Sequence, residues 1–95
     1  MSMADEVSRK ATIKITNKRG LHARASAKVV EAAARFKSQI TVRKDGQTVD
    51  ARSIMGLMML AASLGTEVEI EATGPDADEA LTAILALADA KFGEE

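Results

Sequence analysis

Alternation of apolar and polar residues predicts four β-strands in this chain. Residues 10–16 carry Ala11, Ile13 and Ile15 on one face and lysines and threonines on the other, the pattern of a strand with one dry side. The pair Asp45-Gly46, between residues 39–44 and 47–51, is typical of a two-residue hairpin turn. Residues 66–73 again alternate between polar and apolar side chains, which predicts the fourth strand. The inward residues of the last three strands are Ile40, Val42, Val49, Ala51, Val68, Ile70 and Ala72.

Helical spacing of apolar residues predicts three helices. The first covers residues 23–36, and the second covers residues 53–64 and ends at Gly65. The third begins at Asp76, where Glu79 completes a capping-box pattern, and Gly93 is expected to end it. The inward residues are Ser26, Val29, Val30, Ala33 and Phe36 in the first helix, and Ala80, Leu81, Ile84, Leu87 and Ala88 in the third.

The order strand, helix, strand, strand, helix, strand, helix (βαββαβα) predicts an α+β fold. Because every strand has one polar face, we expect an open-faced β-sandwich, an antiparallel sheet with three helices on one face. The outward glutamates of residues 66–73 favour basic neighbours, which Lys10 and Lys14 of the first strand and Arg43 of the second provide. The fourth strand is therefore expected between these two, giving the order 1-4-2-3.

Composition narrows the class of protein. Ninety-five residues, 46% hydrophobic and 28% charged, are typical of one globular domain. We expect a flexible N-terminal segment over residues 1–8 and a single domain over residues 9–95. The first segment carries Asp5 and Glu6 and no apolar run, so we expect neither a signal peptide nor a membrane anchor, and a cytoplasmic protein.

The missing residue types exclude several kinds of chemistry. The absence of cysteine excludes disulfides and thiol chemistry, and together with the single histidine it leaves too few soft ligands for a zinc site. We therefore expect no metal and no cofactor; the residue types leave carboxylate-bound magnesium as an alternative that no motif supports. A net charge of −1 and only two aromatic residues argue against nucleic-acid binding.

The one histidine, His22, stands in the run Gly20-Leu21-His22-Ala23-Arg24, just before the first predicted helix. Histidine is the side chain that changes charge near neutral pH, whereas the free N–H groups of a helix start and the Arg24 guanidinium suit phosphate oxygens. A histidine in such a loop often serves only as a solvated or capping residue. Gly20 and Arg24, the neighbours of His22, favour a phosphohistidine over a purely structural role. The basic residues expected to enlarge the site into a positive patch are Lys18, Arg19, Lys28 and Arg52.

Residues 54–60 are apolar all round the second helix, although a short helix on a sheet hides only about half of its circumference. Exposed methionines are typical of surfaces that accept several partners. The alternative is that Met55 and Met58 fill gaps in a core poor in aromatic residues. Ser53 is a candidate N-cap of this helix, where a phosphate would be tolerated and would change how the apolar surface meets an acidic partner.

Two separated motifs, the run around His22 and Val-Asp-Ala-Arg-Ser-Ile-Met-Gly-Leu-Met at residues 49–58, resemble HPr, the histidine-containing phosphocarrier of the bacterial phosphoenolpyruvate-dependent phosphotransferase system. The resemblance covers residues 10–92 with the same element order. It implies that Nδ1 of His22 accepts a phosphoryl group from phosphorylated Enzyme I, whose donor is phosphoenolpyruvate, and passes it to an EIIA protein. Arg24 would steady the phosphate. The resemblance makes Ser53 the serine that HPr kinase/phosphorylase modifies in many bacteria, and it gives the docking residues as Ile54, Met55, Met58, Ala23 and Ala27.

The chain departs from the family pattern at Ala25, where a proline that would fix φ in the first helical turn is common. We expect a monomeric carrier without turnover of its own. The alternative is a regulatory interaction protein controlled through Ser53, in a nitrogen-related branch or as the effector of a transcription factor or enzyme. A small hydrolase with His22 as general base is a weak third hypothesis, because no second catalytic group follows in a recognisable arrangement.

Overall fold

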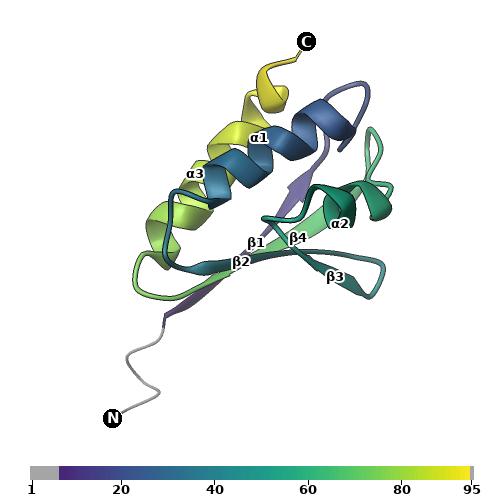
Figure 1. The fold of residues 1–95 in the computed structure, drawn as a ribbon. Coiled ribbons are helices and arrows are strands. Elements are labelled where there is room, and N and C mark those ends of the chain that lie inside the picture. The colour runs from purple at the N-terminus through teal and green to yellow at the C-terminus, as the bar shows by residue number, and fades with distance from the viewer. Residues whose placement is uncertain (1–6, 95) are drawn as a thin grey trace.

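The computed structural model describes residues 7–94, and its elements follow the predicted order (Figure 1). Residues 1–6 of the expected N-terminal segment, and Glu95, lie outside the described residues. The bounds are β1 Ser8–Lys14, α1 Ala23–Ala33, β2 Gln39–Lys44, β3 Gln47–Asp50, α2 Ile54–Met59, β4 Glu67–Thr73, α3 Ala77–Asp89 and the short 3₁₀ turn η2 Lys91–Gly93.

The four strands form one antiparallel sheet in the order β1-β4-β2-β3, as predicted. Helices α1 and α3 lie side by side over one face of the sheet, with α2 on the same side (Figure 1). The predicted open-faced sandwich is therefore confirmed. The charge argument for the position of β4 is confirmed by the register, which pairs Lys10 with Glu71, Lys14 with Glu67 and Arg43 with Glu69.

The core lies between the sheet and the helices and consists mainly of small aliphatic side chains. The predicted inward residues of the two central strands are buried, as are Leu57 of α2 and Phe92 of η2. Ile13 of β1 and Val49 of β3 are only partly buried, because these two strands form the edges of the sheet. The fold thus fixes the central strands most tightly. The buried residues of β2 and β4 are Ile40, Val42, Val68, Ile70 and Ala72.

Strand β1 begins at Ser8 rather than at residue 10, and ends at Lys14. The backbone of Ile15 still pairs, because its N–H donates to Thr66 at 2.8 Å and its carbonyl accepts from Gly65 at 2.8 Å. The chain therefore stays fixed to the turn before β4 until the loop that carries His22 begins.

Helix α2 ends at Met59, whereas the sequence predicted residues 53–64. Ala61 adopts a left-handed φ of +54°, which takes the chain out of the helix. The carbonyl of Ala62 accepts a 2.9 Å hydrogen bond from the N–H of Leu21. A tertiary contact with the histidine loop thus accompanies the early end of the helix, ahead of Gly65.

Helix α1 ends at Ala33 rather than at residue 36. The Arg52 guanidinium donates to the carbonyls of Phe36 at 2.6 Å and Ala33 at 3.4 Å. The prediction that Arg52 joins a patch around His22 is therefore wrong. Its cation lies at the opposite end of α1, where it contacts the last carbonyl of the helix and a carbonyl of the turn that follows.

The predicted capping box of Asp76 and Glu79 is also wrong, because the Asp76 side chain makes no hydrogen bond to α3. Its carboxylate accepts from the hydroxyl of Ser38 at 2.6 Å and from the backbone N–H groups of Ser38 at 2.8 Å and Lys37 at 3.0 Å. These bonds, the Ser38 hydroxyl first, lower the pKa of Asp76 from 3.8 to about 2. Asp76 therefore ties the start of α3 to the start of β2.

Candidate functional site

The loop before α1 is fixed against the segment that follows α2. Gly20 has a φ of +65°, and a Cβ there would lie 2.2 Å from the carbonyl oxygen of Ala62. Leu21 is buried, and its N–H donates to the same oxygen at 2.9 Å. Only glycine fits this approach. The next residue, His22, therefore meets the start of α1 in a defined position.

His22 is the N-cap residue of α1. Its backbone is extended, and its Nδ1 accepts a hydrogen bond from the backbone N–H of Arg24 at 3.3 Å. The sequence left a capping role and a chemical role as alternatives. In the structure the ring caps the helix and is also accessible to a partner, since 23% of the side chain is exposed. At 3.3 Å the capping bond is long and weak. The Nδ1 lone pair thus lies at the positive end of a helix, held only loosely.

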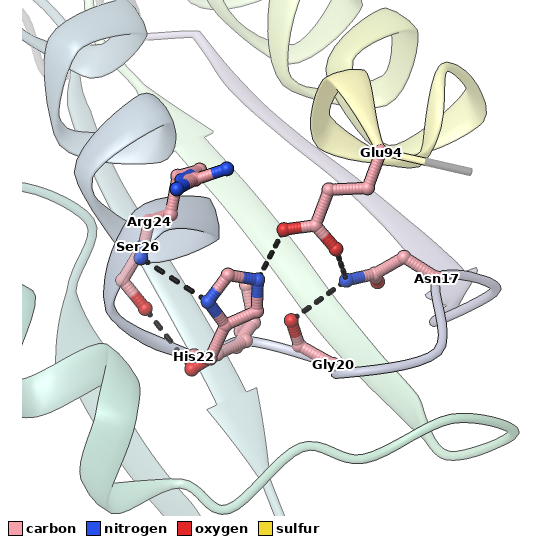
Figure 2. A network of polar contacts seen from close by, with 7 residues as sticks. Asn17, Gly20, His22, Arg24, Ser26 and Glu94 are labelled. Carbon is pink, nitrogen blue, oxygen red and sulfur yellow. Dashed lines mark hydrogen bonds and ion pairs between the residues drawn. The ribbon is translucent and has the colours of Figure 1, made fainter.

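The other ring nitrogen meets a carboxylate that the sequence did not predict. Nε2 of His22 contacts Oε2 of Glu94, whose Oε1 accepts from the Asn17 side-chain amide at 2.9 Å (Figure 2). The same amide nitrogen donates to the carbonyl of Gly20 at 2.8 Å. A buried asparagine thus joins the histidine loop to the end of the chain.

Glu94 reaches His22 because the chain turns back after α3. This helix ends at Asp89, not at Gly93 as predicted, and Lys91 and Phe92 take left-handed φ values of +57° and +55°. Phe92 is buried in the core, and the N–H of Glu94 donates to the carbonyl of Lys91 at 2.9 Å. No local sequence pattern predicts this contact between residues so far apart in the chain.

Positive charge gathers beside His22. Lys18, Arg19 and Arg24 line a pocket of about 260 Å³ together with Glu94, and Lys28 reaches the end of the chain, where a Cβ on Gly93 would lie 2.9 Å from its Nζ. The pKa of Glu94 is lowered by the hydrogen bond from Asn17 first, then by the bond and charge of His22 and by the charge of Arg19, against the opposing effect of desolvation. Glu94 is therefore a carboxylate near neutral pH.

An exposed apolar surface adjoins the histidine. Met55 is 70% exposed and Met58 is 42% exposed, so the alternative in which these two methionines fill core gaps is wrong. Met58 also lines a pocket of about 310 Å³ with His22 and Arg19. Ala23 and Ala27 are exposed on α1. We call the exposed apolar group the methionine surface; its members are Ile54, Met55, Met58, Met59 and Leu64.

Ser53 is the N-cap of α2, as predicted, and its Oγ accepts from the N–H of Gly56 at 2.9 Å. The residue is partly exposed and directly precedes the methionine surface. A hydroxyl that caps a helix and remains reachable has the position that the sequence predicted for a modified serine, although capping alone explains its presence.

Pocket volume does not identify the site. A larger pocket of about 540 Å³ lies between β1 and α3, and no residue from Gly20 to Arg24 lines it. Within residues 7–94, no group of three or more His, Cys, Asp or Glu side chains is arranged to hold a metal ion. No helix in that part of the chain is both long and apolar enough to cross a membrane.

Comparison with known proteins gives a consistent result. A family model described as the PTS HPr component phosphorylation site matches residues 9–90. The phosphocarrier protein HPr of Cupriavidus necator is 55% identical over 84% of this chain and 90% of its own length, and the phosphocarrier protein NPr of Escherichia coli is 41% identical over 90% and 97%. A crystal structure of HPr from Thermoanaerobacter tengcongensis has 49% identity and a TM-score of 0.88, covering 92% of this chain and 98% of that one. The chain belongs to the HPr family of phosphocarrier proteins of the phosphotransferase system.

Proposed function

We propose that the chain carries a phosphoryl group on Nδ1 of His22, taking it from phosphorylated Enzyme I and passing it to a histidine of an EIIA protein in the cytoplasm. The observation that carries this proposal is the position of Nδ1, which faces the first N–H groups of α1 while the ring is partly exposed. The carrier acts as a monomer, and it is a substrate of Enzyme I rather than an enzyme.

The chemistry needs position and charge more than a catalytic group. In an in-line transfer, the donor and acceptor atoms align with phosphorus between them, and fixed positive groups stabilise its oxygens. Backbone N–H groups of α1 and the guanidinium of Arg24 are the groups proposed to bind those oxygens. Lys18 and Arg19, which line the adjacent pocket, add to the positive field.

A direct test is phosphorylation of the full chain by Enzyme I and phosphoenolpyruvate. Wild type is expected to gain one acid-labile phosphate, measured by intact mass before and after acid treatment, and His22→Ala is expected to gain none. Circular dichroism checks that the variant is folded. Equal labelling of both proteins would overturn the proposal.

The methionine surface is proposed to dock Enzyme I and EIIA. Exposed apolar patches mark protein–protein contact sites, and flexible methionines adapt to more than one partner. Met55 is the most exposed member, so Met55→Glu places a charge on the patch without removing a core side chain. We expect this variant to slow transfer to purified EIIA about tenfold or more, while Glu31→Gln on the outer face of α1 matches wild type. An unchanged rate would remove this surface from the docking proposal.

Regulation through Ser53 is the second candidate role, supported by the partly exposed position of the residue beside the methionine surface. A phosphate there would add negative charge next to an apolar docking patch. HPr kinase/phosphorylase is the proposed modifying enzyme. We expect Ser53→Asp to weaken transfer from Enzyme I, with Thr48→Asp at an exposed position of β3 as the control. Equal transfer by both variants and wild type would exclude this role.

The choice between a sugar-transport branch and a nitrogen-related branch depends on the acceptor. The two named relatives include an HPr and an NPr. Phosphorylated carrier mixed with a sugar-type and a nitrogen-type EIIA, each in separate reactions, gives the transfer rate to each acceptor. Faster transfer to the sugar-type protein is expected if the main role is sugar uptake, and the reverse result would support the nitrogen-related alternative.

A further inference from the structure

The hydrogen-bond partners of the His22 ring assign its proton to one nitrogen. Nδ1 accepts from the backbone N–H of Arg24, so this nitrogen has no proton. Nε2 faces Oε2 of Glu94, and a carboxylate only accepts, so Nε2 has the proton. The two independent contacts require the same tautomer, the one in which Nδ1 is the nucleophile.

The backbone and the side chain of Glu94 are each fixed by a separate contact. Phe92 is buried in the core, and the backbone N–H of Glu94 donates to Lys91. The Asn17 amide, which is itself buried, then directs the carboxylate toward the ring by its bond to Oε1. Glu94 thus belongs to a network of polar contacts that joins Asn17 and Gly20 of the loop, the His22 ring and the last described residue (Figure 2).

We propose that Glu94 is a positioning residue for phosphoryl transfer, which holds the proton of His22 on Nε2 and balances the charge that the ring gains when Nδ1 binds phosphorus. This role rests on the transfer proposed above for His22. It gives a function to a residue at the end of the chain that neither the histidine motif nor the methionine surface contains.

The charge follows from the atoms of the step. The Nδ1 lone pair forms the bond to phosphorus, while the bond between phosphorus and the atom of the donor protein breaks and that atom keeps the electron pair. The ring retains its proton on Nε2 and therefore becomes positive. Glu94 accepts a hydrogen bond from this proton, and the opposite charges lie in contact. In the onward transfer the bonding pair returns to Nδ1, and the ring is neutral again.

The first test examines the ring without any phosphate. A ring N–H that is bound to a carboxylate exchanges slowly enough with water to be observed by proton NMR, and two-bond ¹⁵N correlations assign it to Nε2. We expect this signal in the ¹⁵N-labelled wild-type full chain and its loss in Glu94→Ala. The control Asp89→Ala, an exposed acidic residue at the end of α3, is expected to retain it. A signal that persists in Glu94→Ala would overturn the assignment.

The second test measures the rate of phosphorylation by Enzyme I and phosphoenolpyruvate. We expect Glu94→Ala to be slower by about tenfold, by analogy with carboxylates that orient other functional histidines. Glu94→Gln keeps the shape and an acceptor oxygen, so its rate is expected between those of Glu94→Ala and wild type. Asp89→Ala is expected within about twofold of wild type, because Asp89 is not among the contacts of the His22 ring.

The outcomes separate this inference from the proposed function. A wild type that takes up phosphate on His22, with Glu94→Ala labelled at the same rate, contradicts the role of Glu94 and leaves the carrier intact. A wild type that takes up no phosphate contradicts the carrier function and this role with it.

Discussion

At the scale of single residues, His22 combines two roles that the sequence presented as alternatives. Its Nδ1 caps α1, and the same nitrogen is the proposed phosphoryl acceptor. These roles are compatible because the capping bond of 3.3 Å is weak, and a phosphoryl group placed there gives the helix N–H groups stronger acceptors.

Substitutions of Arg24 test how much a planar cation beside His22 contributes to phosphoryl transfer. We expect Arg24→Ala to slow phosphorylation by Enzyme I about tenfold to a hundredfold, because a positive donor is lost from the pocket beside His22. Arg24→Lys keeps the charge without the fork of donors, so its rate should lie between the two. Arg35→Ala, an exposed arginine just beyond α1, is the control. Identical rates for Arg24→Ala and Arg35→Ala would contradict a role for this guanidinium.

Gly20 tests how tightly the histidine loop is fixed. Gly20→Ala places a Cβ 2.2 Å from the Ala62 carbonyl oxygen at a φ of +65°, so backbone must move. We expect a loss of about 2 to 4 kcal/mol in the free energy of unfolding, from strain and overpacking together. Gly46→Ala is also at positive φ, but within residues 7–94 no atom other than those of its chain neighbours lies within 4 Å of the added Cβ, so it should lose only about 1 kcal/mol. Urea denaturation measures both, and equal losses would show that the close approach is unimportant.

The sequence predicted the residues of the site only where they are close together in the chain. His22, Arg24, Lys18 and Arg19 lie in one loop and one helix start, so their proximity followed from the motif. Glu94 comes from the other end of the chain. Its approach to His22 depends on left-handed backbone at Lys91 and Phe92, and neither lysine nor phenylalanine predicts a left-handed conformation.

At the scale of elements, α2 is apolar on all sides, and the structure buries one side of it while the other side is exposed. Leu57 is fully buried, whereas Met55 projects to solvent. Periodicity identified the helix, but it did not predict the end at Met59, which is accompanied by a left-handed Ala61 and by the contact between Ala62 and Leu21.

The two faces of α2 give opposite mutational effects. We expect Leu57→Ala to lower the free energy of unfolding by about 2 to 4 kcal/mol, because it leaves a cavity in the core. Met55→Ala should change stability by less than about 0.5 kcal/mol. Thermal denaturation compares the two variants, and a similar loss in both would contradict the assignment of the faces.

Asp76 links two elements and makes stability depend on pH. Its pKa is lowered to about 2 in the folded protein, so the unfolded chain takes up a proton first as pH falls, and the stabilisation is full above about pH 4 and lost toward pH 2. We expect Asp76→Asn to be less stable than wild type at pH 7 and to lose less stability between pH 4 and 2, roughly the interval between the two pKa values. Asp89→Asn, on the same helix, is the control. Parallel stability curves for Asp76→Asn and wild type would contradict this link.

At the scale of the whole molecule, the order of the strands followed from charge, because the outward glutamates of β4 need basic neighbours on both sides. The register confirms those pairs. Element order and the open sheet followed from periodicity alone. The exact ends of the helices did not follow from periodicity. The end of α1 is accompanied by a contact with Arg52, which is distant in sequence, and left-handed residues follow α2 and α3.

The fold brings the proposed acceptor, the charged pocket and the methionine surface to adjoining positions. His22 and Met58 line one pocket, and Arg19 lines both this pocket and the charged one. A partner that docks on the methionine surface would therefore meet the ring at the same time. This arrangement suits a carrier whose partners supply the second half of the reaction site.

The most direct measurement of the central proposal is heteronuclear NMR of the phosphorylated full chain, labelled with ¹⁵N and phosphorylated by Enzyme I and phosphoenolpyruvate. A ³¹P–¹⁵N coupling identifies the nitrogen that binds phosphorus. We predict a single phosphorus on Nδ1 of His22, with the proton on Nε2. Phosphorus on Nε2, or on any other residue, would contradict the account.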